Sequence, residues 1–221
     1  MTNIRDAYTK DALIKTSVYA CCHVVLLVLS EIFAPLEGTY DSYIYGLCSK
    51  IIIGLLLMPV FCSLIRCIYN KDLLVKDVFY YYTHDYTKVL KLFLTFGLPY
   101  EIISFLSDNV MDIASKLTDN KFIMLLIGLV ALVLLLVFGI MQMLACMRLV
   151  CHCNTEANNG HLFKKALWIE IKYVLLSFVV ILILGLVTFF LSGDIISVIA
   201  LVICEPWYIK KYYKLINREC A

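Results

Sequence analysis

The sequence predicts an all-α fold, a polytopic bundle of about six transmembrane helices that forms one integral membrane domain over residues 1–221. Hydrophobic residues make up 62% of the chain, charged residues only 16%, and the mean hydropathy is +0.89. Soluble domains have a very different composition. The apolar residues also fall in long runs, since 122–147 and 173–192 contain no charged residue. About 20 apolar residues cross the hydrocarbon core, and backbone groups in lipid require helical hydrogen bonds.

The six predicted spans are 17–35, 43–65, 89–106, 122–147, 168–191 and 195–212. The first span follows a polar lead of mixed charge and has no small-residue cleavage site behind it, so we expect it to be retained rather than removed as a signal peptide. The second starts among tyrosines, which are typical of a membrane border. The third is short and is entered through charged residues. The fourth and fifth contain nearly all of the two charge-free runs, and the sixth ends in aromatic and basic residues.

The basic residues are distributed unequally between the two sides of this bundle. Outside the hydrophobic parts of the spans, fifteen lysines and arginines fall on one side and only two, Lys116 and Lys121, on the other. Basic residues accumulate on the cytoplasmic side because they resist translocation. The count predicts that both termini are cytoplasmic, which agrees with an even number of crossings. The usage of lysine, isoleucine, tyrosine and asparagine is compatible with an AT-rich bacterium, and we expect a bacterial plasma membrane.

Aromatic residues gather at the predicted borders of the membrane. Trp168, Trp207 and Tyr208 lie at the cytoplasmic ends of the fifth and sixth spans, where interfacial anchors are common. The connection "KDVFYYYTHDYTK", 76–88, is expected to lie along the inner interface as an amphipathic lead into the third span. A protein partner can use the same surface.

Four charged residues lie within the predicted spans and away from their cytoplasmic ends: Glu31, Lys50, Glu101 and Glu205. A charge at the bilayer centre costs about 3 kcal/mol even on the lenient insertion scale, so such residues generally face protein or water. The first three belong to the outer leaflet and to consecutive helices, which puts an ion pair of Lys50 with Glu31 or Glu101 within reach. Lys91 lies near the inner end of the third span, where its long side chain extends to the interface.

The third span carries a proline just before its glutamate. Pro99 has no amide hydrogen, so the carbonyl of Thr95 loses its partner, and the helix is expected to kink or loosen, helped by Gly97. Transporters build ion or substrate sites from broken spans of this kind. The alternative, which we favour, is a structural kink neutralised by an ion pair. Glu205 in "EPWY" repeats the pattern, and there an interfacial helix terminus is favoured.

The ten cysteines fall within spans or on the predicted cytoplasmic side, which is typical of reduced thiols. The densest group is "CMRLVCHC", 146–153. Its Cys151, His152 and Cys153 are adjacent in the chain and point to different faces of a helix, whereas structural zinc normally needs four converging ligands. We therefore expect no metal site. No cofactor is expected either, since the chain lacks the glycine patterns that bind nucleotide phosphates.

Two stretches carry a resemblance to a known family. The first is "LLVKDVFYYYTHDYTKVLKLFL", from Leu73, an aromatic lead running into a span, and the second is "EPWYIKKYYKL", from Glu205, which closes the last helix. In the order of its features the chain resembles uncharacterised six-span bacterial membrane proteins related to the membrane domain of glycerophosphodiester phosphodiesterase. The resemblance extends over most of the chain. It implies an architecture and no catalytic residues, since that membrane domain is not the hydrolase.

These observations favour a non-enzymatic multi-pass membrane protein, an accessory, scaffold or regulatory component that contacts the lipid bilayer and a membrane-protein partner or a second copy of itself. Nucleic acid is not an expected partner. The alternative is a small transporter or channel that uses Glu31, Lys50, Pro99 and Glu101. An enzyme ranks third, because no nucleophile with its base and no pair of carboxylates lies at a common depth.

The charge count generates a topology prediction. Reporters fused to either terminus are expected to behave as cytoplasmic, because the side with fifteen basic residues stays inside the cell. The measurement is labelling of a cysteine introduced at position 2 with a membrane-impermeant reagent. Labelling in intact cells would overturn the orientation, and labelling only after permeabilisation supports it.

Overall fold

The computed structural model of the chain describes residues 9–34, 40–70, 72–110, 120–151, 159–187 and 193–220. Every element in these ranges is a helix, and no strand occurs among them, so the predicted all-α class is confirmed. Five helical segments are long and apolar enough to cross a membrane: Lys10–Ile32, Ser42–Tyr69, Tyr86–Asp108, Lys121–Cys151 and Gly160–Leu186. They correspond to the first five predicted spans. The predicted ends at 35 and 188–191 lie outside the described residues.

The first two helices are longer than the apolar runs that predicted them. Helix α1, Lys10–Ile32, begins within the polar lead, because the Thr9 hydroxyl accepts a hydrogen bond from the amide of Ala12 (3.2 Å) and caps the first turn. Helix α2, Tyr40–Tyr69, continues through Pro59. The two helices pack along each other. Near the end of α2, the fully buried Lys15 ammonium donates to the Cys67 carbonyl (3.4 Å) and pairs with Asp11 (2.5 Å).

The third span is one continuous helical stretch made of three parts. These are α4, Tyr86–Leu92, the π-helix η3, Phe93–Gly97, and α5, Leu98–Asp108. In η3 the amide of Leu98 donates to the carbonyl of Phe93, one residue further back than in an α-helix. The irregularity expected next to Pro99 is therefore present, and it takes the form of a π-turn immediately before the proline rather than an open break.

The remaining long helices are α7, Lys121–Cys151, α8, Asn159–Val187, and α9, Gly193–Cys220. Helix α9 includes the predicted sixth span, 195–212, but it is not among the five segments that are apolar enough to cross. Its charge-free stretch is short, because Glu205, Lys210 and Lys211 follow within the same helix.

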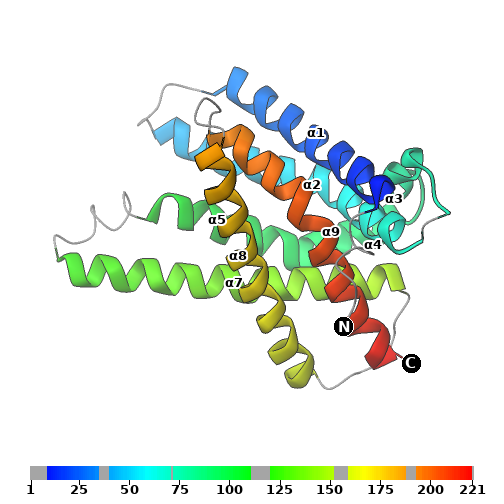
Figure 1. Ribbon diagram of the computed structural model, residues 1–221. Helices are drawn as coiled ribbons and strands as arrows, with labels where there is room; N and C mark the ends of the chain where they lie inside the picture. The colour runs from blue at the N-terminus through cyan, green and yellow to red at the C-terminus, as the bar shows by residue number, and fades with distance from the viewer. Residues whose placement is uncertain are drawn as a thin grey trace.

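The helices form a bundle in which α1, α2 and α9 run side by side (Figure 1). Helix α5 packs between α2 and α7, and α8 packs against α9. The main hydrophobic core lies toward the end of the bundle where α1 begins and α9 ends, here called the inner end. Leu64, Met147 and Tyr212 are fully buried there. At the opposite, outer end α7 extends beyond the other helices (Figure 1).

The aromatic lead into the third span packs against the inner end of α2. It consists of η2, Val75–Phe79, and α3, Tyr80–Thr83. The Ser63 hydroxyl accepts a hydrogen bond from the amide of Tyr81 (3.0 Å), and the Arg66 guanidinium lies 3.6 Å from the centre of the Tyr80 ring. Tyr81 is buried whereas Phe79 is exposed. The segment therefore has a buried and an exposed side, and its exposed side includes apolar residues such as Val75.

Candidate functional site

The contact between α2 and the third span brings several predicted site residues together. The two helices run antiparallel, so that Gly46 lies opposite Phe105 and Met58 opposite Gly97. Between these points the side chain of Glu101 lies directly over Gly54, where an added Cβ atom would be only 2.6 Å from Oε1 of the carboxylate. Glycine at position 54 thus creates the space that Glu101 occupies, as small residues commonly do between membrane helices.

Lys50, one turn from Gly54 on α2, has a different partner from the ones expected. Its ammonium group forms an ion pair with Asp108 and donates a hydrogen bond to the Ser104 hydroxyl (3.0 Å). It forms no ion pair with Glu31 or Glu101. The physical reason is that α5 continues to Asp108, two residues beyond the predicted end of the third span, and one helical turn separates Ser104 from Asp108. Both side chains therefore face Lys50.

Glu101 is half-buried and forms neither an ion pair nor a side-chain hydrogen bond within the described part of the chain. The charges that act on it are those of Lys50 and Asp108, which neutralise each other. Pro99 is the second residue of α5, just after the π-turn, and so lies inside the continuous helical stretch. The irregularity that the sequence predicted is present, but the ion pair expected to neutralise Glu101 is not.

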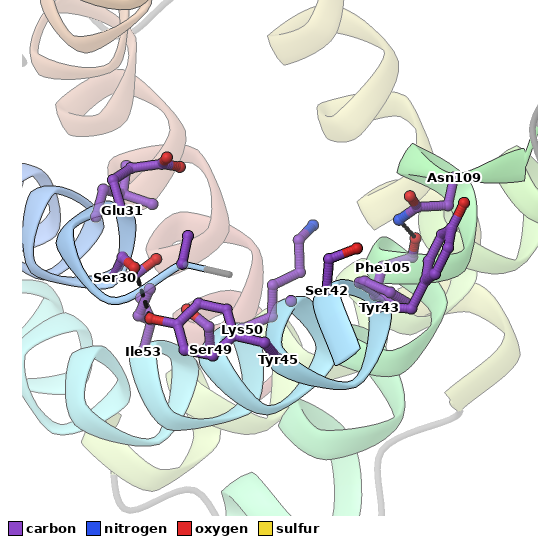
Figure 2. Close-up of a pocket in the computed structure, with 13 residues that line it drawn as sticks. Ser30, Glu31, Ser42, Tyr43, Tyr45, Ser49, Lys50, Ile53, Phe105 and Asn109 are labelled. Carbon is purple, nitrogen blue, oxygen red and sulfur yellow. Dashed lines mark hydrogen bonds between the residues drawn. The ribbon is translucent and has the colours of Figure 1, made fainter. Parts of the chain in front are cut away.

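A pocket of about 500 Å³ opens near the outer end, between α1, α2 and α5. Glu31 and Lys50 both line it, together with Ser30, Ser42, Tyr43, Tyr45, Ser49 and Asn109. Figure 2 shows the Lys50 ammonium and the Glu31 carboxylate on opposite sides of the opening, with the Tyr45 hydroxyl donating to the Ser30 carbonyl (2.5 Å). Pro99 and Glu101 are not among the lining residues. The predicted cluster is thus split between this pocket and the helix contact below it.

Glu205 lies in a second polar cluster that the sequence did not predict as a whole. Its side chain is 5% exposed and accepts a hydrogen bond from the Tyr173 hydroxyl (3.0 Å). A second carboxylate, Glu170 on α8, accepts from the hydroxyls of Tyr208 and Tyr212, the latter at 2.7 Å. The two carboxylates are close enough to act on each other electrostatically. Two glutamates and three tyrosines therefore join α8 to α9.

Two sequence-based interpretations of this region are wrong. Glu205 is not at a helix terminus, since α9 continues through Pro206 to Cys220. Tyr208 is not an interfacial anchor, because it is buried and its hydroxyl binds Glu170. Glu170 lies near the inner end of the predicted fifth span and was not among the candidate residues. The signal was the helical spacing of Glu170 and Tyr173, and of Tyr208 and Tyr212, which places each pair on one helix face.

The cysteines with described side chains are all free thiols. Among the described residues no three histidine, cysteine, aspartate or glutamate side chains gather as a metal site would require. His152 and Cys153, the weak metal candidates, lie outside the described residues.

No protein-family profile, curated protein sequence or solved structure matches this chain. The resemblance to the membrane domain of glycerophosphodiester phosphodiesterase therefore stays a prediction drawn from its motifs.

The cluster between α8 and α9 generates a stability prediction. Replacing Tyr173 with Phe removes the hydroxyl that binds the buried Glu205 carboxylate. The expected loss is roughly 1–3 kcal/mol, since a buried acceptor is left unsatisfied. The measurement is thermal unfolding in detergent of Tyr173→Phe, Glu205→Leu and the double variant. Tyr86→Phe is the matched control, since the Tyr86 hydroxyl has no hydrogen bond among the described residues. Additive losses in the double variant would contradict the contact.

Proposed function

We propose that this chain is a multi-pass protein of a bacterial plasma membrane, with six crossings and both termini cytoplasmic, that acts as an accessory, scaffold or regulatory component without catalytic chemistry of its own. The proposal combines the charge asymmetry of the sequence with one structural observation. That observation is the largely exposed outer half of α7.

The outer half of α7 is covered on one face only, where Met124, Ile127 and Ala131 recur at helical spacing and are half-buried. Apolar residues on its other faces are exposed, from Phe122 (72% exposed) to Leu134. Most of the circumference is therefore available to lipid or to another helix. The outer half of α8 is similarly exposed, as at Leu186. Lipid covers such surfaces, but two long uncovered helices also offer a large area for another membrane protein.

Glycines within these exposed halves support the same role. Nothing lies within 4 Å of a Cβ atom built at Gly128 on α7 or at Gly185 on α8, so neither glycine serves the packing of the described chain. Small residues on a membrane helix permit close approach of a second helix, and association in lipid depends on such packing. We therefore expect a transmembrane helix of a partner protein to contact α7 at Gly128.

The test is photo-crosslinking in native membranes. A photoreactive residue at Leu129, next to Gly128, is expected to give an adduct with one polypeptide of defined mass, and Gly128→Leu is expected to reduce its yield several-fold because the helices can no longer approach closely. The matched control places the same group at Ile52, an exposed residue of α2. An adduct with twice the mass of this chain would show that the contacting helix belongs to a second copy of the chain rather than to another protein. Adducts with lipid alone would contradict the accessory role.

A second candidate function, a small transporter or channel, is favoured by the environment of Glu101. Lys50, the residue expected to neutralise Glu101, is engaged by Asp108 instead. A π-turn ends one helical turn before this glutamate, and such turns occur frequently at functional sites. An ionisable residue in a span without a charged partner is by default a candidate for ion or proton binding. The outer pocket between Glu31 and Lys50 gives a solute access to the same end of the helix contact (Figure 2).

Replacement of Glu101 by Gln separates a transport role from a structural one. Because Glu101 forms no ion pair with a described residue, Glu101→Gln is expected to melt within a few degrees of the wild type. If the carboxylate carries a cation or a proton, flux into proteoliposomes is lost in the same variant. Flux is measured with pH-sensitive and cation-sensitive dyes, beside unfolding in detergent.

The controls use the neighbouring ion pair. Asp108→Asn breaks an exposed pair, which is worth roughly 1 kcal/mol or less, and should change stability little. Strong destabilisation by Glu101→Gln that is rescued by also replacing Lys50 would show a structural pair and sink the transport role. Unchanged flux in a well-folded Glu101→Gln protein would sink it as well.

A further inference from the structure

A second, larger cavity lies at the inner end of the bundle and belongs to none of the sites described above. It is a groove of about 750 Å³ between the third span, α7 and α8. Its apolar wall comprises Leu92, Phe96, Met141, Leu144, Ala145 and Phe163. Thr95 and Gly160 complete the lining together with two basic residues, Lys91 and Arg148.

The groove is electrostatically one-sided. Lys91 and Arg148 are the charged residues of its lining, and no acidic residue is among them. Lys91 is exposed, and its ammonium group has no hydrogen bond or ion pair within the described ranges. A groove with two cations and an apolar wall is complementary to a molecule that carries both an anionic group and a hydrocarbon chain.

The cations and the apolar wall of the groove lie at different depths along the helices. Lys91 is in α4 near the start of the third span, Arg148 is in the last turn of α7, and Gly160 is in the first turn of α8. These are the helix ends that the charge count assigns to the cytoplasmic face. Met141 is two turns deeper than Arg148, about 10 Å along the helix. The cations therefore lie at headgroup level and the apolar wall extends into the hydrocarbon.

We propose that this groove binds an anionic phospholipid of the inner leaflet, with its phosphate between Lys91 and Arg148 and one acyl chain along Phe96, Met141 and Leu144. The inner leaflet supplies anionic lipids, and basic pockets between transmembrane helices on that side bind their headgroups. A free phosphate compound needs the cations but not the apolar wall. A protein segment would need no anionic group at this position. The lipid uses both features, and it fits the accessory and transport roles equally.

The test compares an anionic and a zwitterionic phospholipid that have the same acyl chains. Purified protein in a neutral detergent is titrated with phosphatidylglycerol, phosphatidylcholine of the same acyl chains, or glycerol 3-phosphate, and thermal unfolding and native mass spectrometry are recorded. Phosphatidylglycerol is expected to raise the melting temperature and to stay bound, whereas the other two do neither. In Lys91→Gln its apparent affinity is expected to fall about fivefold, the effect of one interfacial cation.

Lys164→Gln is the matched control, since Lys164 is an exposed lysine beside Phe163 that does not line the groove. Arg148→Gln, made only in addition to Lys91→Gln, should abolish the difference between the two lipids. Equal stabilisation by both lipids in the wild type, equal losses in Lys91→Gln and Lys164→Gln, or full protection by glycerol 3-phosphate alone would overturn the proposal. None of these outcomes bears on the crosslinking at Leu129, so the two proposals fail separately.

Discussion

The close antiparallel contact between α2 and the third span is the constraint on which the rest of the structure depends. It is made possible by glycines on both helices, since Gly46 and Gly54 accommodate side chains of α5 and Gly97 accommodates Phe93 and Met58. In lipid there is no hydrophobic drive between helices, and complementary packing of this kind takes its place. With these helices fixed, α7 packs on α5 and the inner core closes around α9. The polar residues of the contact are thus held by the shape of their neighbours.

The two polar clusters solve the problem of buried charge in different ways. Between α8 and α9, tyrosine hydroxyls donate directly to Glu170 and Glu205, so the carboxylates are hydrogen-bonded within the protein. Charge-assisted bonds of this type are stronger than neutral ones and hold two helices in register. At the outer end the Lys50–Asp108 pair is partly exposed, and Glu101 is half-buried with no hydrogen-bond partner for its side chain among the described residues. The first arrangement fixes α8 against α9, whereas the second leaves the Glu101 carboxylate without a hydrogen bond from a described residue.

The sequence was sufficient for features that depend on composition and local chemistry. Long apolar runs predicted five of the helices, and Pro99 predicted an irregular turn in the third span. Features that depend on helix rotation were not predictable in the same way. The partner of Lys50 depends on how far α5 extends and which face Asp108 occupies, and the cluster around Glu170 depends on how α8 and α9 are turned toward each other. The position of a residue in the chain predicts how deep its side chain lies in the membrane. The direction that the side chain faces around the helix axis depends on how the helices pack.

The π-turn at Phe93–Gly97 has a geometric consequence for everything that follows it in the third span. A π-turn accommodates one residue more than an α-turn, and one residue corresponds to about 100° around a helix. Glu101, Ser104 and Asp108 meet α2 only with that additional rotation. If the turn tightened to α geometry, the same side chains would sweep away from Gly54 and Lys50 toward a neighbouring helix or lipid, with little change in their depth. The segment from Phe93 to Gly97 thus determines which direction around the helix axis the Glu101 carboxylate faces. Inserting or deleting a single residue there would turn the side chains of α5 toward a different neighbour.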